Sequence, residues 1–485
     1  MKISINNFKS IGSLANYEMR PLTILSGTNS SGKSSFIQLL LLLKQTLEAA
    51  STKQPLSIEG KFYNANNFLD LVKGKQPSTK VEVKFSITKE EFASFGELIQ
   101  KSIFDYFPSY VCDFRICYSF IANEIKIVEF EVSYLTVIKK EFLLIKYNDK
   151  NKLVIDTNNE YFLKYDNQKE EGSNSQLQSL EVNYVAFIPK SIEETIRKFD
   201  PEILDKEGNP STIDEKSLMN INVDSVKSFL ENYFSGLYYI GPLRNEPQDS
   251  YINNIGANWV GIKGENTAQI LEKYKDEFIE CNTPILDGNL IKFKVEKITL
   301  IEATIIWMCK IFKLGKRLYT KELSENYSIF LENENGIETT IKHVGFGISQ
   351  ILPIITQGLL MKNGETLILE QPEIHLHPKI QSSLFDFLYS LVLQGKKIIV
   401  ETHSDHLITR LRRRVAEDAS SSLQAMVNLT FIESVGDGLT FNKMKLDDTG
   451  VYDIFPEDFI DNPEKELKAL LNAQMLKLKS KRTNL

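Results

Sequence analysis

The chain has 485 residues, 42% of them hydrophobic and 25% charged, which is enough for two or three domains of ~100–200 residues whose cores need neither disulfides nor metals. Its net charge of −7 and pI of about 5.6 argue against a general nucleic-acid scaffold, although a local basic face is compatible with them. Neither CxxC nor zinc-ligand spacing occurs among the cysteines, so we expect reduced core residues at Cys112, Cys117, Cys281 and Cys309.

The N-terminus lacks the apolar core of a signal peptide. The most apolar run, Phe36–Leu43, is far shorter than the ~20 residues that span a bilayer. We therefore expect a cytoplasmic protein with no membrane partner.

The first fifty residues predict strands, a glycine loop and a helix. Lys2–Phe8 alternates in the way of an edge strand, and Leu22–Leu25 fits a short buried strand. Within Ser34–Glu48, apolar residues recur at spacings of three and four, which predicts a helix with one broad apolar stripe.

Residues 80–165 change to a period of two, which predicts an antiparallel sheet. Its expected strands are Val81–Ile87, Lys126–Tyr134, Glu141–Tyr147 and Lys152–Asp156. The polar segment Gln168–Ser175 is typical of a loop. Helical periodicity follows at Ser191–Lys198 and Asp224–Tyr233. We interpret residues 81–236 as a β-rich and helical insertion between two halves of one sheet.

Short apolar runs return in the C-terminal half and predict central parallel strands that are covered on both faces. They are Leu237–Ile240, Glu365–Leu369 and Lys397–Glu401. A predicted helix at Lys379–Leu393 separates the last two runs, as in a crossover unit.

The glycine loop, Gly27–Ser34, fits the phosphate-loop pattern GxxxxGK[ST] between a strand and a helix. Its glycines let backbone N–H groups turn toward phosphates. We expect Lys33 to reach the β- and γ-phosphates of ATP and the Ser34 hydroxyl to bind Mg²⁺.

Two apolar strands end in side chains suited to nucleotide chemistry. Glu370 ends the first and is placed to meet Mg²⁺ at the edge of a sheet, and His403 follows the second, where it is suited to contact the γ-phosphate or the attacking water. For His375 and His377 a loop-positioning role is favoured, since the HxH pair has no evident third metal ligand. A further glycine turn at Val344–Gln350 is able to present N–H groups to a phosphate.

Together, these four motifs resemble those of the ABC-type heads of SMC, RecF and OLD-like ATPases. The opening segment Asn7–Ile11 resembles the same heads. A closer resemblance is to bacterial AAA-type ATPases whose Walker B motif reads EQPExHLHP, here Glu370–Pro378. Tyr239–Arg244 and Leu446–Pro456 fit the same family. The resemblance covers residues 1–50 and 237–465.

The resemblance implies an α/β ABC-type head with a mixed sheet and an insertion. Its expected parts are an N-terminal lobe at 1–80, the insertion at 81–236, a C-terminal lobe at 237–465 and a basic tail at 466–485. It also implies roles for individual residues. Those implied to bind phosphate and Mg²⁺ are Gly27, Asn29, Ser31, Gly32, Lys33, Ser34 and Ser35.

Further implied roles concern the metal, the opposite subunit and the switch. Glu370 takes the metal-facing Walker B position. Gly345, Gly347 and Ser349 form a signature that contacts ATP bound to the opposite subunit, and His403 is the switch histidine. Gln76 is a weak candidate for the Q-loop.

One residue departs from the family pattern. Gln371 stands where a glutamate usually polarises the attacking water. Glutamine is able to orient a water but cannot accept its proton. General-base catalysis typically raises the rate of the chemical step ~10²–10⁴-fold. We expect either slow hydrolysis with an ATP-stabilised dimer, or catalysis by Glu370 or Glu373.

Several relatives act in anti-phage defence, for example in the Septu (PtuA) and PARIS (AriA) systems, which implies an effector partner such as a nuclease and a DNA or phage-derived trigger. The acidic pairs Asp447-Asp448 and Glu457-Asp458 stand in isolated turns, and the sequence after His403 contains no acidic cluster of the kind that forms a nuclease active site.

The alternative is a RecF-like ATPase that clamps DNA. It is supported only by basic side chains, namely Arg410, Arg412, Arg413, Arg414, Lys477, Lys479, Lys481 and Arg482. A transporter subunit is disfavoured by the long insertion and by a signature unlike LSGGQ.

Overall fold

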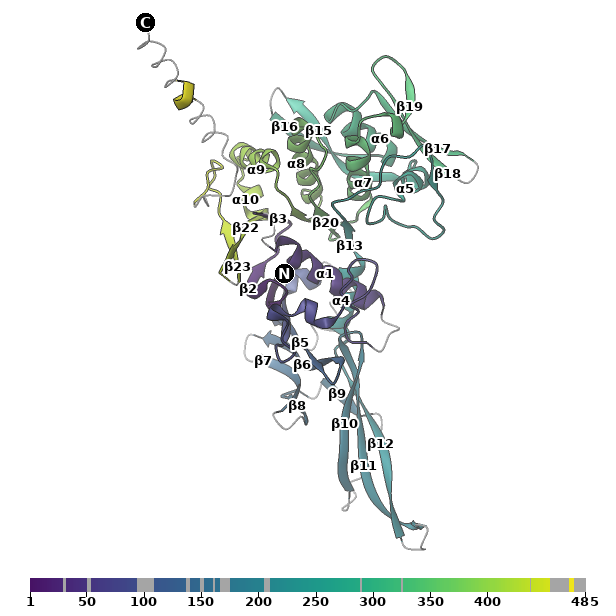
Figure 1. Ribbon diagram of the computed structural model, residues 1–485, viewed down its shortest axis with the longest axis vertical. Coiled ribbons are helices and arrows are strands. Elements are labelled where there is room, and N and C mark those ends of the chain that lie inside the picture. Colours follow the sequence, from purple (N-terminus) through teal and green to yellow (C-terminus); the bar gives the residue numbers. More distant parts are fainter. Residues whose placement is uncertain are drawn as a thin grey trace.

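A computed structural model describes residues 1–28, 32–49, 54–93, 109–136, 140–148, 152–159, 162–165, 175–204, 210–287, 290–323, 326–436, 438–453 and 471–474. Figure 1 shows a body of sheets and helices from which a long β-arm extends. No helix within these ranges combines the length and apolar character that crossing a membrane requires.

The central sheet joins segments from both ends of the chain. In spatial order it contains β13 (Leu237–Ile240), β20 (Thr366–Glu370), β21 (Lys397–Glu401), β3 (Leu22–Gly27), β22 (Val427–Val435) and β23 (Gly438–Met444). The first five strands are parallel and β23 is antiparallel. The predicted α/β class with a mixed sheet is therefore confirmed.

This sheet separates two hydrophobic cores, because successive strand residues face opposite sides. Leu25 and Ile399 contribute to one core, and Ile24 and Val400 to the other. The predicted continuous apolar runs follow directly from this double burial.

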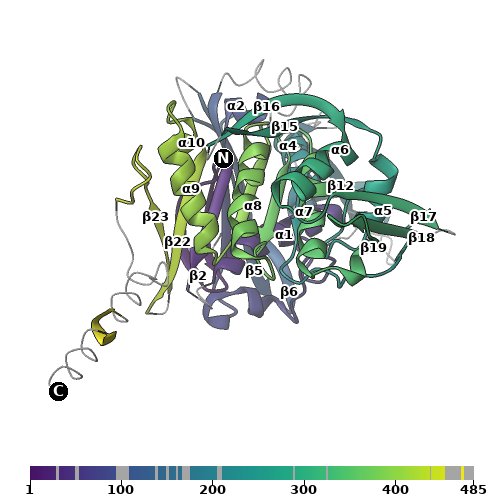
Figure 2. The ribbon, with the colours of Figure 1, turned by 90° about the horizontal axis from the view of Figure 1, so that it is seen from above.

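Helices cover both faces of the central sheet (Figure 2). One core includes α1 (Lys33–Glu48) and α4 (Asp224–Ser235). The other includes α5 (Thr267–Tyr274), α6 (Leu300–Ile305), α7 (Gly347–Leu360), α8 (Pro378–Val392), α9 (Asp405–Glu417) and α10 (Ser422–Met426). The helices predicted around residues 34–48, 224–233 and 379–393 are confirmed.

A seven-stranded antiparallel sheet packs on the same side of the central sheet as α1 and shares its hydrophobic core. Its order is β2 (Ile11–Glu18), β1 (Lys2–Phe8), β4 (Val81–Thr88), β5 (Ser109–Ile121), β6 (Glu124–Thr136), β7 (Lys140–Tyr147) and β8 (Leu153–Thr157), with the short helix α2 (Lys89–Ala93) after β4. The prediction that Lys2–Phe8 is an edge strand is wrong, because β2 pairs with its outer side. A bulge between Ile3 and Ile5 leaves Ile11, Leu14 and Tyr17 buried at a spacing of three, which hides β2 from a period-two pattern.

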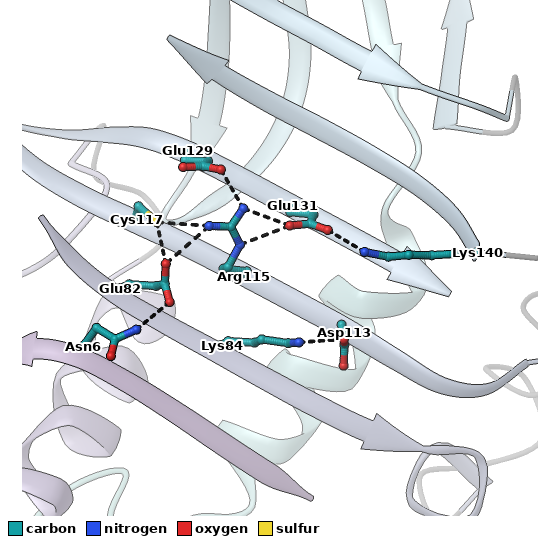
Figure 3. Close-up of polar contacts among 9 residues, drawn as sticks. All are labelled: Asn6, Glu82, Lys84, Asp113, Arg115, Cys117, Glu129, Glu131 and Lys140. Atoms are coloured by element: carbon teal, nitrogen blue, oxygen red, sulfur yellow. Dashed lines mark hydrogen bonds and ion pairs between the residues drawn. The ribbon is translucent and has the colours of Figure 1, made fainter. Parts of the chain in front are cut away.

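The other face of this sheet carries a charge network (Figure 3). Arg115 on β5 pairs with Glu82 on β4 and with Glu129 and Glu131 on β6, at N···O distances of 3.3, 2.6 and 2.9 Å. Its neighbours Phe114 and Ile116 point into the core, as strand alternation requires.

The arm contains β9 (Leu163–Tyr165), β10 (Ser175–Val185), β11 (Ile188–Leu204) and β12 (Pro210–Ile221). The helix predicted at Ser191–Lys198 is wrong, because these residues lie in β11 and pair on both sides. Ile192 and Ile196 are four apart, a spacing that suits one face of a helix or of a strand equally. The loop predicted at Gln168–Ser175 lies outside the described residues except for Ser175, which begins β10.

Smaller elements complete the body. They are β14 (Tyr251–Ile252), β15 (Phe278–Asp287), β16 (Leu290–Thr299), β17 (Arg317–Leu323), β18 (Asn326–Glu332), β19 (Glu338–Thr340), the 3₁₀ turns Phe68–Leu71, Lys73–Lys75 and Ile341–His343, and the π-helix Ile306–Ile311. All four cysteines are free and buried, as predicted. β1 and β4 are neighbours in one sheet, although the boundary predicted at residues 80 and 81 lies between them in the sequence. The domain boundaries stay a prediction.

Candidate active site

The phosphate loop lies between β3 and α1, and two of its glycines are required by the backbone. Gly27 has φ 149°, and a Cβ there would lie 2.0 Å from the carbonyl oxygen of Ile432 on β22. Gly32 has φ 77°, and a Cβ would lie 2.4 Å from Ser10 Oγ. Only glycine fits either position without displacing its neighbours. Asn29 and Ser31 lie outside the described residues.

The side chains of Lys33 and Ser35 make polar contacts around the phosphate loop. Lys33 is 3% exposed, and its Nζ donates to the carbonyl oxygens of Gly27 and Thr28 at 3.2 and 2.7 Å. Burial lowers the pKa of Lys33, and the charge of Glu401 opposes that shift. Ser35 Oγ lies 3.0 Å from Ser10 Oγ, which connects the opening segment Asn7–Ile11 to the phosphate loop.

Two glutamates end adjacent parallel strands beside this loop. Glu370 on β20 is directly opposite Glu401 on β21, and β21 is the neighbour of β3. The Ser34 hydroxyl donates to both Glu401 carboxylate oxygens, at 3.2 and 3.0 Å. The Tyr239 hydroxyl donates to Glu370 Oε1 at 3.1 Å.

Both carboxylates are poorly solvated, and both have raised pKa values. Burial and then the charge of Glu401 raise the pKa of Glu370 to about 7, while the Tyr239 hydrogen bond opposes the shift. Burial also raises the pKa of Glu401, which the charge of Lys33 and the Ser34 hydrogen bond counteract.

The donor set of Ser34, Glu370 and Glu401 fits Mg²⁺. All three offer oxygen ligands, which Mg²⁺ prefers, and Mg²⁺ commonly takes only one or two carboxylates besides substrate phosphates. Two adjacent carboxylates of raised pKa also form a site where a divalent cation would relieve the repulsion. When bound, the cation neutralises charge on the phosphates.

The sequence motifs do not single out Glu401. Its sequence signal was the same as that of Glu370, a carboxylate that ends an apolar strand. What the sequence did not contain was the strand order, which puts β21 between β20 and the phosphate-loop strand.

The acidic turn, Gln371–His375, follows Glu370. Gln371 has a left-handed φ of 43°, and its N–H donates to the carbonyl oxygen of Glu401 at 2.8 Å. Glu373 is 8% exposed, and its Oε1 accepts the backbone N–H of His403 at 2.7 Å. Glu373 therefore connects the acidic turn to the predicted switch histidine. Partial burial and the charge of Lys33 lower the pKa of His403 and favour neutral imidazole.

His375 and His377 have positioning contacts, in agreement with the favoured interpretation. His377 Nδ1 accepts the Lys379 N–H at 3.3 Å at the start of α8. The His375 ring lies edge-on to Phe346, with centroids 5.4 Å apart. This contact joins the acidic turn to the glycine turn.

The glycine turn Val344–Gln350 leads into α7. Gly345 and Phe346 are exposed, and a Cβ at Gly345 would meet no atom of the described residues within 4 Å. Ser349 is 7% exposed, and its Oγ donates to the carbonyl oxygen of Phe346 at 2.8 Å. The outward-facing groups are thus at Gly345 and Phe346, and the signature roles of Gly345, Gly347 and Ser349 stay predictions. Gln76 is exposed after the second 3₁₀ turn, and its Q-loop role also stays a prediction.

Comparisons with known proteins show the family of the chain. A family model described as an AAA ATPase domain matches residues 1–408. A search of curated proteins gave no significant match.

Similar solved structures are SMC heads. The head bound to the C-winged helix domain of ScpA has a TM-score of 0.46, with 92% of this chain and 97% of that chain covered. For the Thermotoga maritima head the values are 0.36, 92% and 98%, and for the Pyrococcus furiosus head with an extended coiled coil they are 0.41, 98% and 98%. Identity is 10% in each case, so the family of the chain is shown by the match over residues 1–408. The chain belongs to the AAA ATPase domain family and is an ATPase.

Proposed function

We propose that this ATPase is a nucleotide-gated assembly. It binds ATP and Mg²⁺ between two copies, hydrolyses ATP slowly and controls a separate effector, such as a nuclease or toxin, in anti-phage defence. The observation that carries the proposal is the open glycine turn, where Gly345 and Phe346 are exposed next to the acidic turn of the same chain. A second copy would supply the phosphate that this turn is suited to contact.

Slow hydrolysis is supported by the partners of the carboxylates. Glu370 accepts from Tyr239, Glu373 accepts from His403, and Glu401 accepts from Ser34. Gln371, which is placed next to Glu370, cannot act as a base. The site is therefore better suited to hold ATP than to turn it over rapidly.

Assembly is tested by light scattering with and without Mg²⁺ and ATP. The native chain should dimerise with ATP, and Lys33→Ala should not. Gly345→Arg enters open space in the single chain, so it should bind ATP and stay monomeric. Leu135→Arg, at a 53% exposed position on β6, is the matched control and should dimerise. A native chain that binds ATP as a monomer would contradict the proposal.

Turnover is tested by single-turnover hydrolysis of the native chain, Gln371→Glu and Glu373→Gln. We expect a slow native rate that Gln371→Glu increases. A fast native rate that neither substitution changes would contradict slow gating.

The effector is tested by ATP-dependent co-purification from the native host, with Lys33→Ala as control, followed by a nuclease assay on the co-purified partner.

The DNA-clamp alternative depends on basic side chains that have partners within the chain. Arg414 and Arg410 pair with buried Asp386 at 2.7 and 3.1 Å, Arg412 donates to the carbonyl oxygen of Gly450, and Arg413 pairs with Glu417. The basic tail residues from Lys477 to Arg482 lie outside the described residues. Salt-dependent DNA binding by the purified chain would favour this alternative.

A further inference from the structure

Arg244 is a buried cation that has no role in the binding of phosphate or Mg²⁺ described for the phosphate loop and the two glutamates. It is 6% exposed and lies in the loop that follows β13. Two backbone hydrogen bonds fix this loop, from Gly241 N–H to Ile262 and from Asn245 N–H to Lys263, both at 2.9 Å. The position of the guanidinium is thus set by a part of the chain separate from the acidic turn.

The guanidinium contacts the backbone at the end of β20. Its Nη2 donates to the carbonyl oxygens of Glu370 and Gln371, at 3.2 and 3.4 Å. Within the part of the chain that the structure describes, its Nε and Nη1 have no hydrogen-bond partner, and neither does Glu373 Oε2. The charge of Glu373 favours the cation, although burial lowers the pKa of Arg244 to about 10. A buried charge whose donors lack acceptors lowers the stability of the fold. We therefore expect Arg244 to have a function that offsets this cost.

The backbone that Arg244 contacts is strained. Gln371 has a φ of 43°, in the left-handed region that residues other than glycine, asparagine, aspartate and histidine rarely occupy. On one side the Gln371 N–H is held by Glu401, and on the other its carbonyl faces Arg244. Such conformations persist only where the surroundings over-determine them.

We propose that Arg244 is a positioning residue for ATP hydrolysis, which holds the acidic turn so that Gln371 stays beside Glu370 and Glu373 keeps His403 in place. The inference rests on the ATPase activity and requires neither the effector nor the dimer. Lysine should not substitute, because its single ammonium lacks the further donors, Nε and Nη1, that the planar guanidinium holds beside the nitrogen that reaches both carbonyl oxygens.

The test compares single-turnover hydrolysis with the Kd for a fluorescent ATP analogue. Arg244→Lys and Arg244→Ala should hydrolyse ATP roughly tenfold to hundredfold more slowly, with Kd changed less than about threefold. Added guanidinium chloride at low concentration should restore part of the Arg244→Ala rate and leave the native rate unchanged. Arg414→Ala removes another buried arginine, which is 4% exposed, and serves as the control. It should lower the stability of the chain, and added guanidinium should not change its rate of hydrolysis.

A second readout keeps the inference testable if native hydrolysis is too slow to follow. Hydrogen exchange should accelerate at residues 370–376 and 402–405 in Arg244→Lys, while α1 exchanges as in the native chain. Native rates and native exchange in Arg244→Lys would overturn the inference. So would a parallel loss of stability and ATP affinity without guanidinium rescue. ATP-dependent dimerisation, measured separately, reports on the proposed assembly and not on Arg244.

Discussion

Replacing Glu370 by glutamine should have opposite effects on the free and the nucleotide-bound protein. The structure raises the pKa of Glu370 from 4.5 to about 7. Since a pKa difference of one corresponds to about 1.4 kcal/mol, this rise corresponds to about 3 kcal/mol. The folded chain binds this proton more tightly than the unfolded chain. Its stability therefore falls as the pH rises from about 4.5 to about 7, and above 7 the ionised carboxylate carries the full cost.

Glutamine is neutral at every pH and is able to accept the Tyr239 hydrogen bond. Glu370→Gln should therefore be more stable than the native chain by up to about 3 kcal/mol at pH 9 and nearly equal to it at pH 4.5. In a thermal melt this is a rise of ~3–7 °C, depending on the size of the cooperative unit. Mg²⁺ and ATP should stabilise the native chain more than the variant, because the variant has lost a metal-facing carboxylate.

Differential scanning fluorimetry at several pH values, with and without Mg²⁺ and ATP, measures both effects. Glu365→Gln removes a carboxylate just before the first residue of β20 and controls for the loss of one negative charge. Equal melting temperatures at pH 9, or an advantage of the variant that is as large at pH 4.5, would refute the electrostatic reasoning.

Three further substitutions test other contacts. Glu401→Gln should weaken Mg²⁺-dependent nucleotide binding ~10–100-fold, because it changes the partner of Ser34, and a Mg²⁺ titration of ATP binding measures this. Gly27→Ala should destabilise the chain by at least about 2 kcal/mol in urea unfolding, since its Cβ would meet the Ile432 carbonyl, whereas Gly345→Ala should unfold like the native chain. Asp386→Ala should cost about 3–5 kcal/mol in the same assay, because it removes the buried carboxylate partner of Arg414 and leaves only Glu417 to pair with that buried charge. A loss no greater than that of Glu417→Ala would contradict a buried ion pair.

The sequence by itself determined the elements that local patterns encode. The phosphate loop needs glycines, a lysine and a serine within eight consecutive residues, and the strand and helix around it have their own periodicity. β13, β20 and β21 were predicted almost to the residue, because strands buried on both faces are continuous apolar runs.

Only the tertiary structure decided how these elements meet. The order of parallel strands places Glu401 against Ser34, and no local pattern encodes which strand lies next to which. Ile192 and Ile196 fit a helix or a strand, and pairing with β10 and β12 selects the strand. Arg244 lies 126 residues before Glu370, so its contact with that backbone carbonyl depends wholly on the fold. The sequence thus determined a nucleotide loop and its carboxylate-ended strands, and long-range packing decided which side chains surround them.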